Sequence, residues 1–509
     1  MAQPLTSINL VAPAFKGLNT EDAALAQDPS FAEVADHAVI DRRGRLASRK
    51  GLSVITTTKT ELGTDYIKAI HEFRDSGGNE KTFSVGNNKI LSGEATLADE
   101  TPAAYAISAD NWKMVNFNDS IYFFQRGQEP LAYSNSSAAV EKLSLVAGAA
   151  GVSSAMYGNE VLAAYGRLWT ADISSDTSTI YWSDLLQGHV WTGGSSGSID
   201  VTKAWPNGYD EIVALAAHND FLIIFGRDSI LTYSGAEDPA SMTLADAISG
   251  VGCVDRDTVQ NTGSDIIFLS YGGLAGLGRT IQEQSMPMNN LSSGVSKDIV
   301  ELAADEATGF SSAYHPKQKF YLICFAGQKT IYCFDTRARL EDGSLRATRW
   351  PSILFKSLHS SDRESGRLLI GGAHGIGVYS GYDDDGETYR FKYSSPELSF
   401  GDTAKLKFLK KIRPTMIGGS GQPIAIKWAY DFGTRSGSAT ITPTISNPTE
   451  YNVAEYNIDE YTSGSLVVRE GVNANGSGLT LAITIEADIN GTELSIQEIN
   501  VLALTGRAL

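Results

Sequence analysis

The stretch IVALAAHNDFLIIFGRDSILTY, residues 212–233, sets the pattern for most of this chain. Two apolar runs flank the polar pair Asn219-Asp220, and a third apolar run begins at Ile230 after another polar turn. Short apolar runs joined by an Asn-Asp or Gly-bearing turn are typical of antiparallel β-hairpins. The stretch therefore predicts a small antiparallel sheet.

Runs of the same kind recur along the chain, with roughly 40 to 53 residues between successive turns. They lie at residues 66–91, 112–133, 161–182, 212–233, 258–274, 312–335 and 354–379. This interval is the length of one four-stranded propeller blade, and strands repeated at that length fit small sheets packed around an axis. We therefore expect a β-propeller of six or seven blades over residues 60–385, with a large irregular β-sandwich as the alternative.

A second all-β domain is expected after the propeller. The charged, apolar-poor segment 381–387 marks the boundary, so this domain takes residues 386–509. Alternating apolar residues indicate half-buried antiparallel strands; they are Ile424, Ile426, Trp428 and Tyr430, then Leu479, Leu481, Ile483 and Ile485. The alternation changes phase between Ile496 and Ile499, which indicates a β-bulge. A β-sandwich of six to eight strands accommodates this pattern.

The first 59 residues differ in character from both domains. Residues 38–40 and 46–49 are placed to pair across the turn Asp41-Arg42-Arg43-Gly44, so we expect a hairpin within an N-terminal assembly arm. Helical periodicity is scarce in the whole chain. The short candidates are residues 21–26, 30–36 and 297–304.

Composition points to an acidic, nearly all-β protein. Its 509 residues include 50 Gly, and Asp plus Glu (59) exceed Lys plus Arg (41), for a net charge of -18. That balance argues against a protein that grips nucleic acid through a basic face, because an acidic surface repels phosphate. No run approaches the roughly twenty apolar residues that cross a bilayer, and the start lacks a secretion signal, which predicts a soluble protein.

Several segments, in order along the chain, carry a resemblance to a known family. They are residues 17–20 (GLNT), the motif Asp41-x-x-Gly44-x-Leu46-x-x-Arg49-x-Gly51, residues 180–184 (IYWSD) with 189–191 (HVW), the stretch 212–233, and residues 250–257 (GVGCVDRD) running on to 265–273 (DIIFLSYGG). In their order and spacing these segments resemble the tail nozzle proteins of podoviruses, the group that includes tail tubular protein B and the packaged-DNA stabilisation proteins. One position departs from the pattern: where the family usually has an Asn in the first strand, this chain has His37-Ala38.

The resemblance implies a non-enzymatic structural protein of a short-tailed bacteriophage. Family members form a ring, commonly of six subunits, beneath an adaptor ring, with fibres or spikes around it and DNA passing along the axis. We therefore expect a hexameric homo-oligomer in the virion tail, made in the host bacterial cytoplasm, that conducts DNA during ejection without binding it specifically or inserting in a membrane. A surplus of acidic groups facing the channel would keep DNA from sticking.

Two short motifs invite a chemical interpretation. Residues 193–197 (GGSSG) have the spelling of a nucleophile elbow around Ser195, but no helix pattern follows, so a Gly/Ser loop is expected. Asp383, Asp384 and Asp385 lack the alternate spacing of a Ca²⁺ loop, which favours a solvated linker.

Other polar and sulfur-bearing residues have simpler explanations. Residues 174–178 (SSDTS) are similar to the Asp-containing turns of sialidase-type propellers, where the Asp side chain ties its own backbone. The cysteines lie in apolar runs and the histidines show no metal-ligand spacing; they are Cys253, Cys324 and Cys333, and His37, His71, His189, His218, His315, His359 and His374. We expect no catalytic residue, no cofactor and no metal site.

Two other functions are compatible with the fold alone. A propeller that binds or cleaves host surface carbohydrate would bring aromatic side chains together with two carboxylates about 5 to 9 Å apart. A cellular protein-interaction scaffold suits a propeller equally well. Neither accounts for the family segments.

Overall fold

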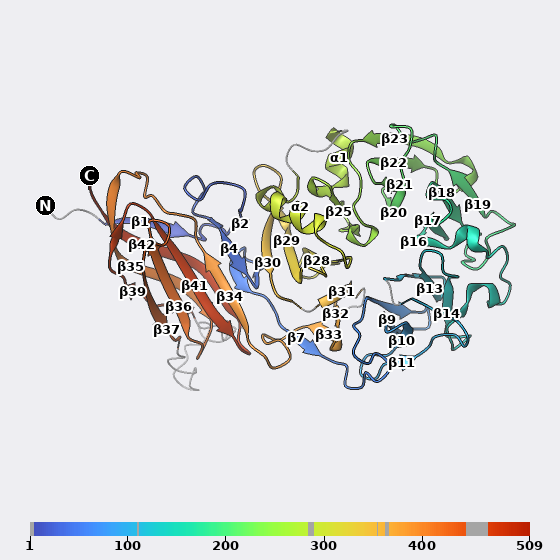
Figure 1. The fold of residues 1–509 in the computed structure, drawn as a ribbon, viewed down its shortest axis with the longest axis horizontal. Coiled ribbons are helices and arrows are strands. Elements are labelled where there is room, and N and C mark those ends of the chain that lie inside the picture. The colour runs from blue at the N-terminus through green and yellow to red at the C-terminus, as the bar shows by residue number, and fades with distance from the viewer. Residues whose placement is uncertain are drawn as a thin grey trace, which may run out of the picture.

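The computed structural model describes residues 5–108, 111–283, 290–353, 355–361, 366–443 and 467–508. The described chain forms two β domains along one long axis, a propeller at one end and a β-sandwich at the other (Figure 1). Both chain ends lie at the sandwich end. The expected all-β class and the propeller and sandwich architectures are confirmed.

Seven small sheets surround the propeller axis, and the first four follow the chain as regular four-stranded blades. Blade 1 holds β8 (Ala69–Arg74), β9 (Glu80–Gly86), β10 (Lys89–Ser92) and β11 (Ala98–Asp99), and blade 2 holds β12 (Lys113–Phe117), β13 (Ser120–Phe124), β14 (Leu131–Ser134) and β15 (Glu141–Lys142). Blade 3 holds β16 (Gly158–Ala164), β17 (Arg167–Ile173), β18 (Thr179–Trp182) and β19 (Gly197–Asp200), and blade 4 holds β20 (Ile212–His218), β21 (Phe221–Gly226), β22 (Ser229–Ser234) and β23 (Thr243–Ser249).

The last three blades are less regular. Blade 5 has three strands, β24 (Gln260–Asn261), β25 (Ile266–Ser270) and β26 (Gly273–Gly276), and blade 6 has β27 (Phe310–His315), β28 (Phe320–Phe325), β29 (Thr330–Arg339) and β30 (Leu345–Trp350). Blade 7 combines β31 (Phe355–Ser360), β32 (Leu368–Gly372) and β33 (Gly375–Tyr379) with β7 (Leu52–Val54). Because β7 precedes blade 1 in the chain, its antiparallel pairing with β33 closes the ring. Leu354, the first residue of the seventh predicted run, lies outside the described residues.

Residues 212–233 form strands of blade 4 because their apolar side chains pack into two neighbouring cores. In β21, Leu222 and Ile224 pack in the core shared with blade 3, while Ile223 and Phe225 pack in the core shared with blade 5. The sequence of a strand that is buried on both faces is a continuous run of apolar residues. The predicted turn at Asn219-Asp220 is confirmed, with φ of 48° and 64°, a left-handed conformation that Asn and Asp tolerate.

The sandwich consists of two sheets around one core. The first sheet contains β34 (Tyr389–Ser394), β41 (Leu481–Ile489), β36 (Ile424–Tyr430) and β37 (Arg435–Ile441). The second contains β35 (Lys405–Gly418), β42 (Leu494–Ala508), β38 (Val467–Arg469), β39 (Val472–Asn473) and β40 (Ser477–Gly478). The predicted bulge is confirmed: Thr415 pairs with Glu498 and Met416 with Ile496, so Gln497 is the extra residue.

The N-terminal segment contributes strands to both domains. β1 (Thr6–Leu10) pairs with β42, and β5 (Ala38–Ile40) with β6 (Leu46–Ser48) forms the predicted hairpin, which extends the same sheet. The short strands β2 (Gly17–Leu18) and β3 (Phe31–Ala32) pair with each other. The physical reason is burial: Leu10, Phe15 and Leu18 lie in a core that runs from the sandwich into blades 5 and 6, where their apolar surface is removed from water.

One strand of this segment joins the domains into a single sheet. β4 (Val34–Asp36) lies between β30 of blade 6 and β34 of the sandwich and pairs with both. The result is a nine-stranded sheet that runs from the propeller through the sandwich.

Helices are few among the described residues. α2 (Ser296–Ala304) lies where it was predicted, while α1 (Leu277–Glu283) was not predicted. The expected helix at 21–26 is a turn, and that at 30–36 contains β3 and β4. These short segments pair with neighbouring strands, so tertiary contacts override their weak helical periodicity.

Arg49 fills the junction between the domains. Its side chain is 1 % exposed, and its guanidinium pairs with the carboxylate of Asp384 through Nη1–Oδ1 and Nη2–Oδ2 contacts of 2.9 and 2.6 Å. The guanidinium carbon lies 4.0 Å from the ring centroid of Tyr389 and 5.8 Å from that of Trp350. Since Trp350 ends blade 6 and Tyr389 begins the sandwich, this one side chain contacts both domains.

The rest of the opening motif serves the same junction. Asp41 Oδ1 accepts a hydrogen bond of 2.9 Å from the backbone N–H of Arg45 and so holds the hairpin turn. Gly51 lies against the linker, because a Cβ added there would be 1.7 Å from the carbonyl oxygen of Asp383. The motif therefore marks the place where the N-terminal hairpin meets the linker between the domains.

His37 has a left-handed backbone beside the junction. Its φ is 51°, in the region that Asn adopts more readily than most residues. His37 also accepts a hydrogen bond of 3.1 Å at Nδ1 from Nε of Arg49. The imidazole thus contacts the Arg49 side chain at the junction.

Replacement of Arg49 with Met tests the junction. Removing one partner of a buried ion pair leaves the other carboxylate without its charge partner, so the free energy of unfolding should fall by about 3 kcal/mol. Urea denaturation followed by tryptophan fluorescence measures this, with the exposed Arg42→Met as the matched control. Equal stability of the two variants would contradict the assigned role.

Candidate functional site

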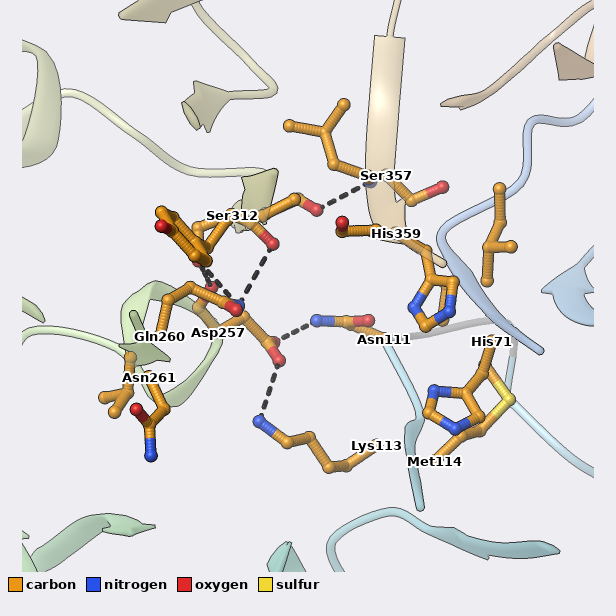
Figure 2. Close-up of a pocket in the computed structure, with 18 of the residues that line it drawn as sticks. His71, Asn111, Lys113, Met114, Asp257, Gln260, Asn261, Ser312, Ser357 and His359 are labelled. Atoms are coloured by element: carbon orange, nitrogen blue, oxygen red, sulfur yellow. Dashed lines mark hydrogen bonds and ion pairs between the residues drawn. The ribbon is translucent and has the colours of Figure 1, made fainter. Parts of the chain in front are cut away.

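A cavity of about 590 Å³ lies at the propeller axis and is the strongest candidate site on the described surface. Its walls come from the axial parts of blades 1, 2, 5, 6 and 7, in residues 68–71, 111–114, 257–263, 311–316 and 357–360. The first strands of the blades contact one another around the axis, so residues that are far apart in sequence converge here. Polar side chains project into this space from several blades (Figure 2).

Asp257 is the centre of the polar network in the cavity. Its carboxylate accepts a hydrogen bond from the amide of Asn111 and lies 3.8 Å from Nζ of Lys113, both in blade 2 (Figure 2). Its backbone carbonyl accepts a hydrogen bond of 2.6 Å from Oγ of Ser312 in blade 6. Asp255 Oδ1 accepts the Asp257 backbone N–H at 2.8 Å and fixes this short 3₁₀ turn. Asp257 thus ties blades 2, 5 and 6 together.

A buried cluster of charges lies beside this network. Arg256 is 4 % exposed, donates to the carbonyl oxygen of Asn111, and has Nε 3.4 Å from the carboxylate of Asp257. Glu160 of blade 3 is 2 % exposed and lies 3.8 Å from Nζ of Lys113. Burial raises the pKa of Glu160 to about 7, against the opposing effect of the charges on Lys113 and Arg256. The cluster extends the cross-blade contacts to blade 3.

Two imidazoles form another wall of the cavity. The ring centroids of His71 and His359 are 4.7 Å apart, and both rings face the cavity from blades 1 and 7 (Figure 2). Burial lowers the pKa of His71 well below its ordinary value, and the neighbouring His359 and Lys113 lower it further. Nε2 of His71 is buried and has no hydrogen-bond partner in the described chain.

Three serines of the cavity, Ser311, Ser312 and Ser357, are engaged in hydrogen bonds with the backbone. The hydroxyl of Ser312 donates to the carbonyl of Asp257, Ser357 donates to the carbonyl of Ile67 at 3.1 Å, and Ser311 accepts the backbone N–H of Leu358 at 2.9 Å. Nucleophilic catalysis requires a hydroxyl within hydrogen-bond reach of a base. The arrangement is suited to binding and to holding blades together.

The structure places the motifs singled out from the sequence away from this cavity. Oγ and backbone N of Ser195 both donate to Oδ1 of Asp184 at 2.8 Å, in an exposed loop that leads into strand β19 and not into a helix. Asp176 accepts the backbone N–H of Ser178 at 3.2 Å, as expected for a structural Asp turn. Asp384 of the three-aspartate linker is not simply solvated, because it pairs with Arg49.

Sulfur and imidazole groups are dispersed through the described part of the chain. Cys253, Cys324 and Cys333 are buried and unpaired. Within the described residues there is no group of three or more His, Cys, Asp or Glu side chains that could hold a metal ion. None of the helices that are described has the length and apolarity needed to span a membrane.

No pattern in the sequence indicates that the axial residues form a site. His71 lies in blade 1 and His359 in blade 7, far apart in the sequence, so no local spacing connects them. The segment 250–257 carries part of the family resemblance. Its Asp-Arg-Asp run directly after a small apolar stretch is also a local signal for buried charge. Charged residues are seldom buried unless they are paired, so such a run predicts a network.

Comparison with known proteins finds only distant structural likenesses. No family model and no curated protein matches the chain. Among solved structures, the chain is similar to the extracellular domain of a one-component system protein from B. thetaiotaomicron (12 % identity, 66 % of this chain and 40 % of that chain, TM-score 0.42). It is also similar to the WD40 domain of Pan2 from Neurospora crassa (9 %, 65 % and 94 %, 0.39) and to a protein from Lactobacillus plantarum (12 %, 68 % and 92 %, 0.35).

These likenesses are too distant to transfer a function. The chain spans about two fifths of the length of the B. thetaiotaomicron domain. All three TM-scores are below 0.5 and all identities are 12 % or less, so none of these proteins' functions is carried over.

The buried histidines predict a loss of stability in acid. Burial lowers the pKa of His37 to about 3, helped by the charge of Arg49, and burial lowers that of His315 to about 4. Below pH 6.5 the unfolded chain binds protons that the folded chain does not. The free energy of unfolding should therefore decrease as the pH is lowered, by about 1 kcal/mol per pH unit for each such group.

His37→Asn isolates one of these groups. Asn suits the left-handed backbone, so the variant should fold and should show a shallower decline of the unfolding free energy between pH 6 and pH 4.5. Urea titrations across that range measure the slope, and parallel curves for the variant and the parent chain would contradict the assignment.

Proposed function

We propose that this chain is a structural, non-enzymatic subunit of the tail nozzle ring of a short-tailed bacteriophage. The observation that carries the proposal is where the family segments lie in the fold. The motif that ends in Arg49 and Gly51 forms the junction between the domains, and residues 250–257 supply Asp255 and Arg256 to the cross-blade cluster. The residues that resemble the family therefore hold the architecture together.

The connection between the domains supports a structural role. Strand β4 makes one continuous sheet out of blade 6 and the sandwich, and Arg49 locks the same boundary. Domains that work by opening and closing are joined through a few hinge residues, whereas this boundary is a hydrogen-bonded sheet. A subunit of this kind keeps its shape when a ring transmits force.

In the proposed particle six copies form a ring below the tail adaptor, with fibres or spikes attached around it. The chain is made in the host cytoplasm and resides in the virion tail. Double-stranded DNA passes through the axis during ejection without specific binding. Six chains, each with a net charge of -18, repel phosphate wherever their acids face the channel, which keeps the friction of the passing DNA low.

Electron microscopy tests this function in two steps. The purified full chain, alone and with tail adaptor protein from the same virus, should give rings in negative stain. Gold-labelled antibody against the propeller should then mark the tail of intact virions. Particles without tail label, or a chain that stays monomeric with and without adaptor, would overturn the proposal.

A carbohydrate-binding propeller is the second candidate, and the axial cavity is the observation that favours it. Asn111, Gln260, Asn261 and the imidazoles of His71 and His359 offer hydrogen-bonding groups in a space of about 590 Å³. Binding fits better than glycoside cleavage, because Glu160 is sealed beneath the cavity and does not line it.

Saturation-transfer NMR with oligosaccharides from the host surface tests this second candidate. Binding should give transfer to the sugar protons, and the signal should vanish in Asn261→Leu, which removes a side-chain amide from the cavity wall. The matched control is Asn135→Leu on the outer part of blade 2. The absence of transfer from every host glycan fraction would rule out this candidate.

A further inference from the structure

Charge is distributed very unevenly between the two domains. Residues 60–385 contain 40 acidic and 23 basic residues, whereas residues 386–509 contain 13 and 11. Within the propeller the excess is greatest in blades 3 and 4, where residues 158–249 contain twelve acidic and three basic residues. These two blades lie at the end of the molecule that is farthest from the sandwich (Figure 1).

Strand β35 at the opposite end has the reverse character. Its sequence, KLKFLKKIRPTMIG, contains five basic residues and no acidic one. Leu409, Ile412 and Met416 point into the sandwich core. Lys411 and Arg413 project to the other side, since the space beside Gly471 is bounded by Cε of Lys411 and Cγ of Arg413.

We define the basic face as Phe408, Lys410, Lys411 and Arg413 of β35 together with Arg469 of β38. Arg469 pairs with Glu498 at 3.3 Å, but Lys410, Lys411 and Arg413 have no acidic partner in the part of the chain that the structure describes. Phe408 is 38 % exposed. Exposed aromatic and arginine side chains are enriched at protein interfaces, and the lysines beside them add positive charge that can steer an acidic partner.

A complementary patch lies on one edge of blades 3 and 4. We define the acidic tip as Leu185, Leu186, Asp220, Phe221 and Glu237. Leu185 and Leu186 are 50 % and 55 % exposed and pack beside the hairpin turn at Gly166. Asp220 and Glu237 both lie close enough to Tyr165, next to that turn, to raise the pKa of its hydroxyl, although burial is the larger cause. The members therefore gather around one hairpin turn.

We propose that the basic face of one copy docks on the acidic tip of the next copy. This inference rests on the proposed function, because it names the contact through which the ring closes. The two patches have opposite charge and each contains exposed apolar side chains, so both steering and burial favour the contact. The blades that hold the acidic tip and the strand that holds the basic face lie at opposite ends of the molecule, so the contact is head-to-tail, and it gives a ring when the rotation between copies closes.

Charge reversal on either side tests the contact in the full-length chain. Lys410→Glu, Lys411→Glu and Arg413→Glu together alter the basic face, and Asp220→Asn with Glu237→Lys alters the acidic tip while keeping a residue that tolerates left-handed φ at position 220. The matched control carries Lys297→Glu, Lys319→Glu and Lys329→Glu. These three lysines are exposed, lie away from the basic face, and give the same change in charge. Thermal melting monitored by circular dichroism establishes that each variant is folded.

Mass photometry then reads the oligomeric state. The parent chain and the control should form rings at low salt and dissociate near 1 M salt, where charges are screened, while each patch variant should remain monomeric. A mixture of the two patch variants retains one intact interface between unlike chains, so it should give dimers and stop there.

Three results would overturn the inference. If the parent chain forms rings and the basic-face variant does so equally well, the docking surface is elsewhere and the nozzle function still stands. If the basic-face variant forms rings but no longer retards a double-stranded DNA fragment that the parent chain retards, the face binds nucleic acid. If the parent chain forms no ring with or without adaptor, the proposed function fails together with the contact.

Discussion

The ion pair between Arg49 and Asp384 is the interaction on which the arrangement of the two domains depends. A guanidinium that is 1 % exposed cannot be left without an anion, since burial of an unpaired charge costs far more than a hydrogen bond returns. The pair therefore fixes the linker after blade 7 against the end of the N-terminal hairpin. Tyr389 and Trp350 on either side of the guanidinium extend that constraint into both domains.

Ring closure follows from the same segment. Directly after Arg49 the chain enters β7, which pairs with β33 and completes blade 7. Earlier in the same segment, before the hairpin of β5 and β6, β4 bridges blade 6 and the sandwich. A short stretch near the N-terminus thus closes the propeller, joins the two domains and contains Arg49, whose charge holds them together. Its strands are only three residues long, so their stability comes from neighbours and not from their own hydrogen bonds.

Much of the fold could be predicted because its signals are local. The apolar runs around Asn219-Asp220 revealed a blade, and the phase change near Gln497 revealed a bulge, since each pattern reflects a periodicity within a few residues. The strand pairings of the N-terminal segment could not be predicted, because the partners of β1 and β7 lie more than three hundred residues away. The axial cavity was missed for the same reason, as His71 and His359 meet only when blade 7 returns to blade 1.

By itself the sequence determined the strand repeat, the blade length, the boundary near residue 381 and the surplus of acidic charge, because hydrophobic period and charge are properties of consecutive residues. Only the tertiary structure decided which strand closes the ring, why Arg49 and Gly51 belong to one motif, and that the charges separate to opposite ends of the long axis. Those outcomes depend on contacts between segments that are distant in the chain. The free energy of such contacts is set by packing and burial in three dimensions, which no local pattern encodes.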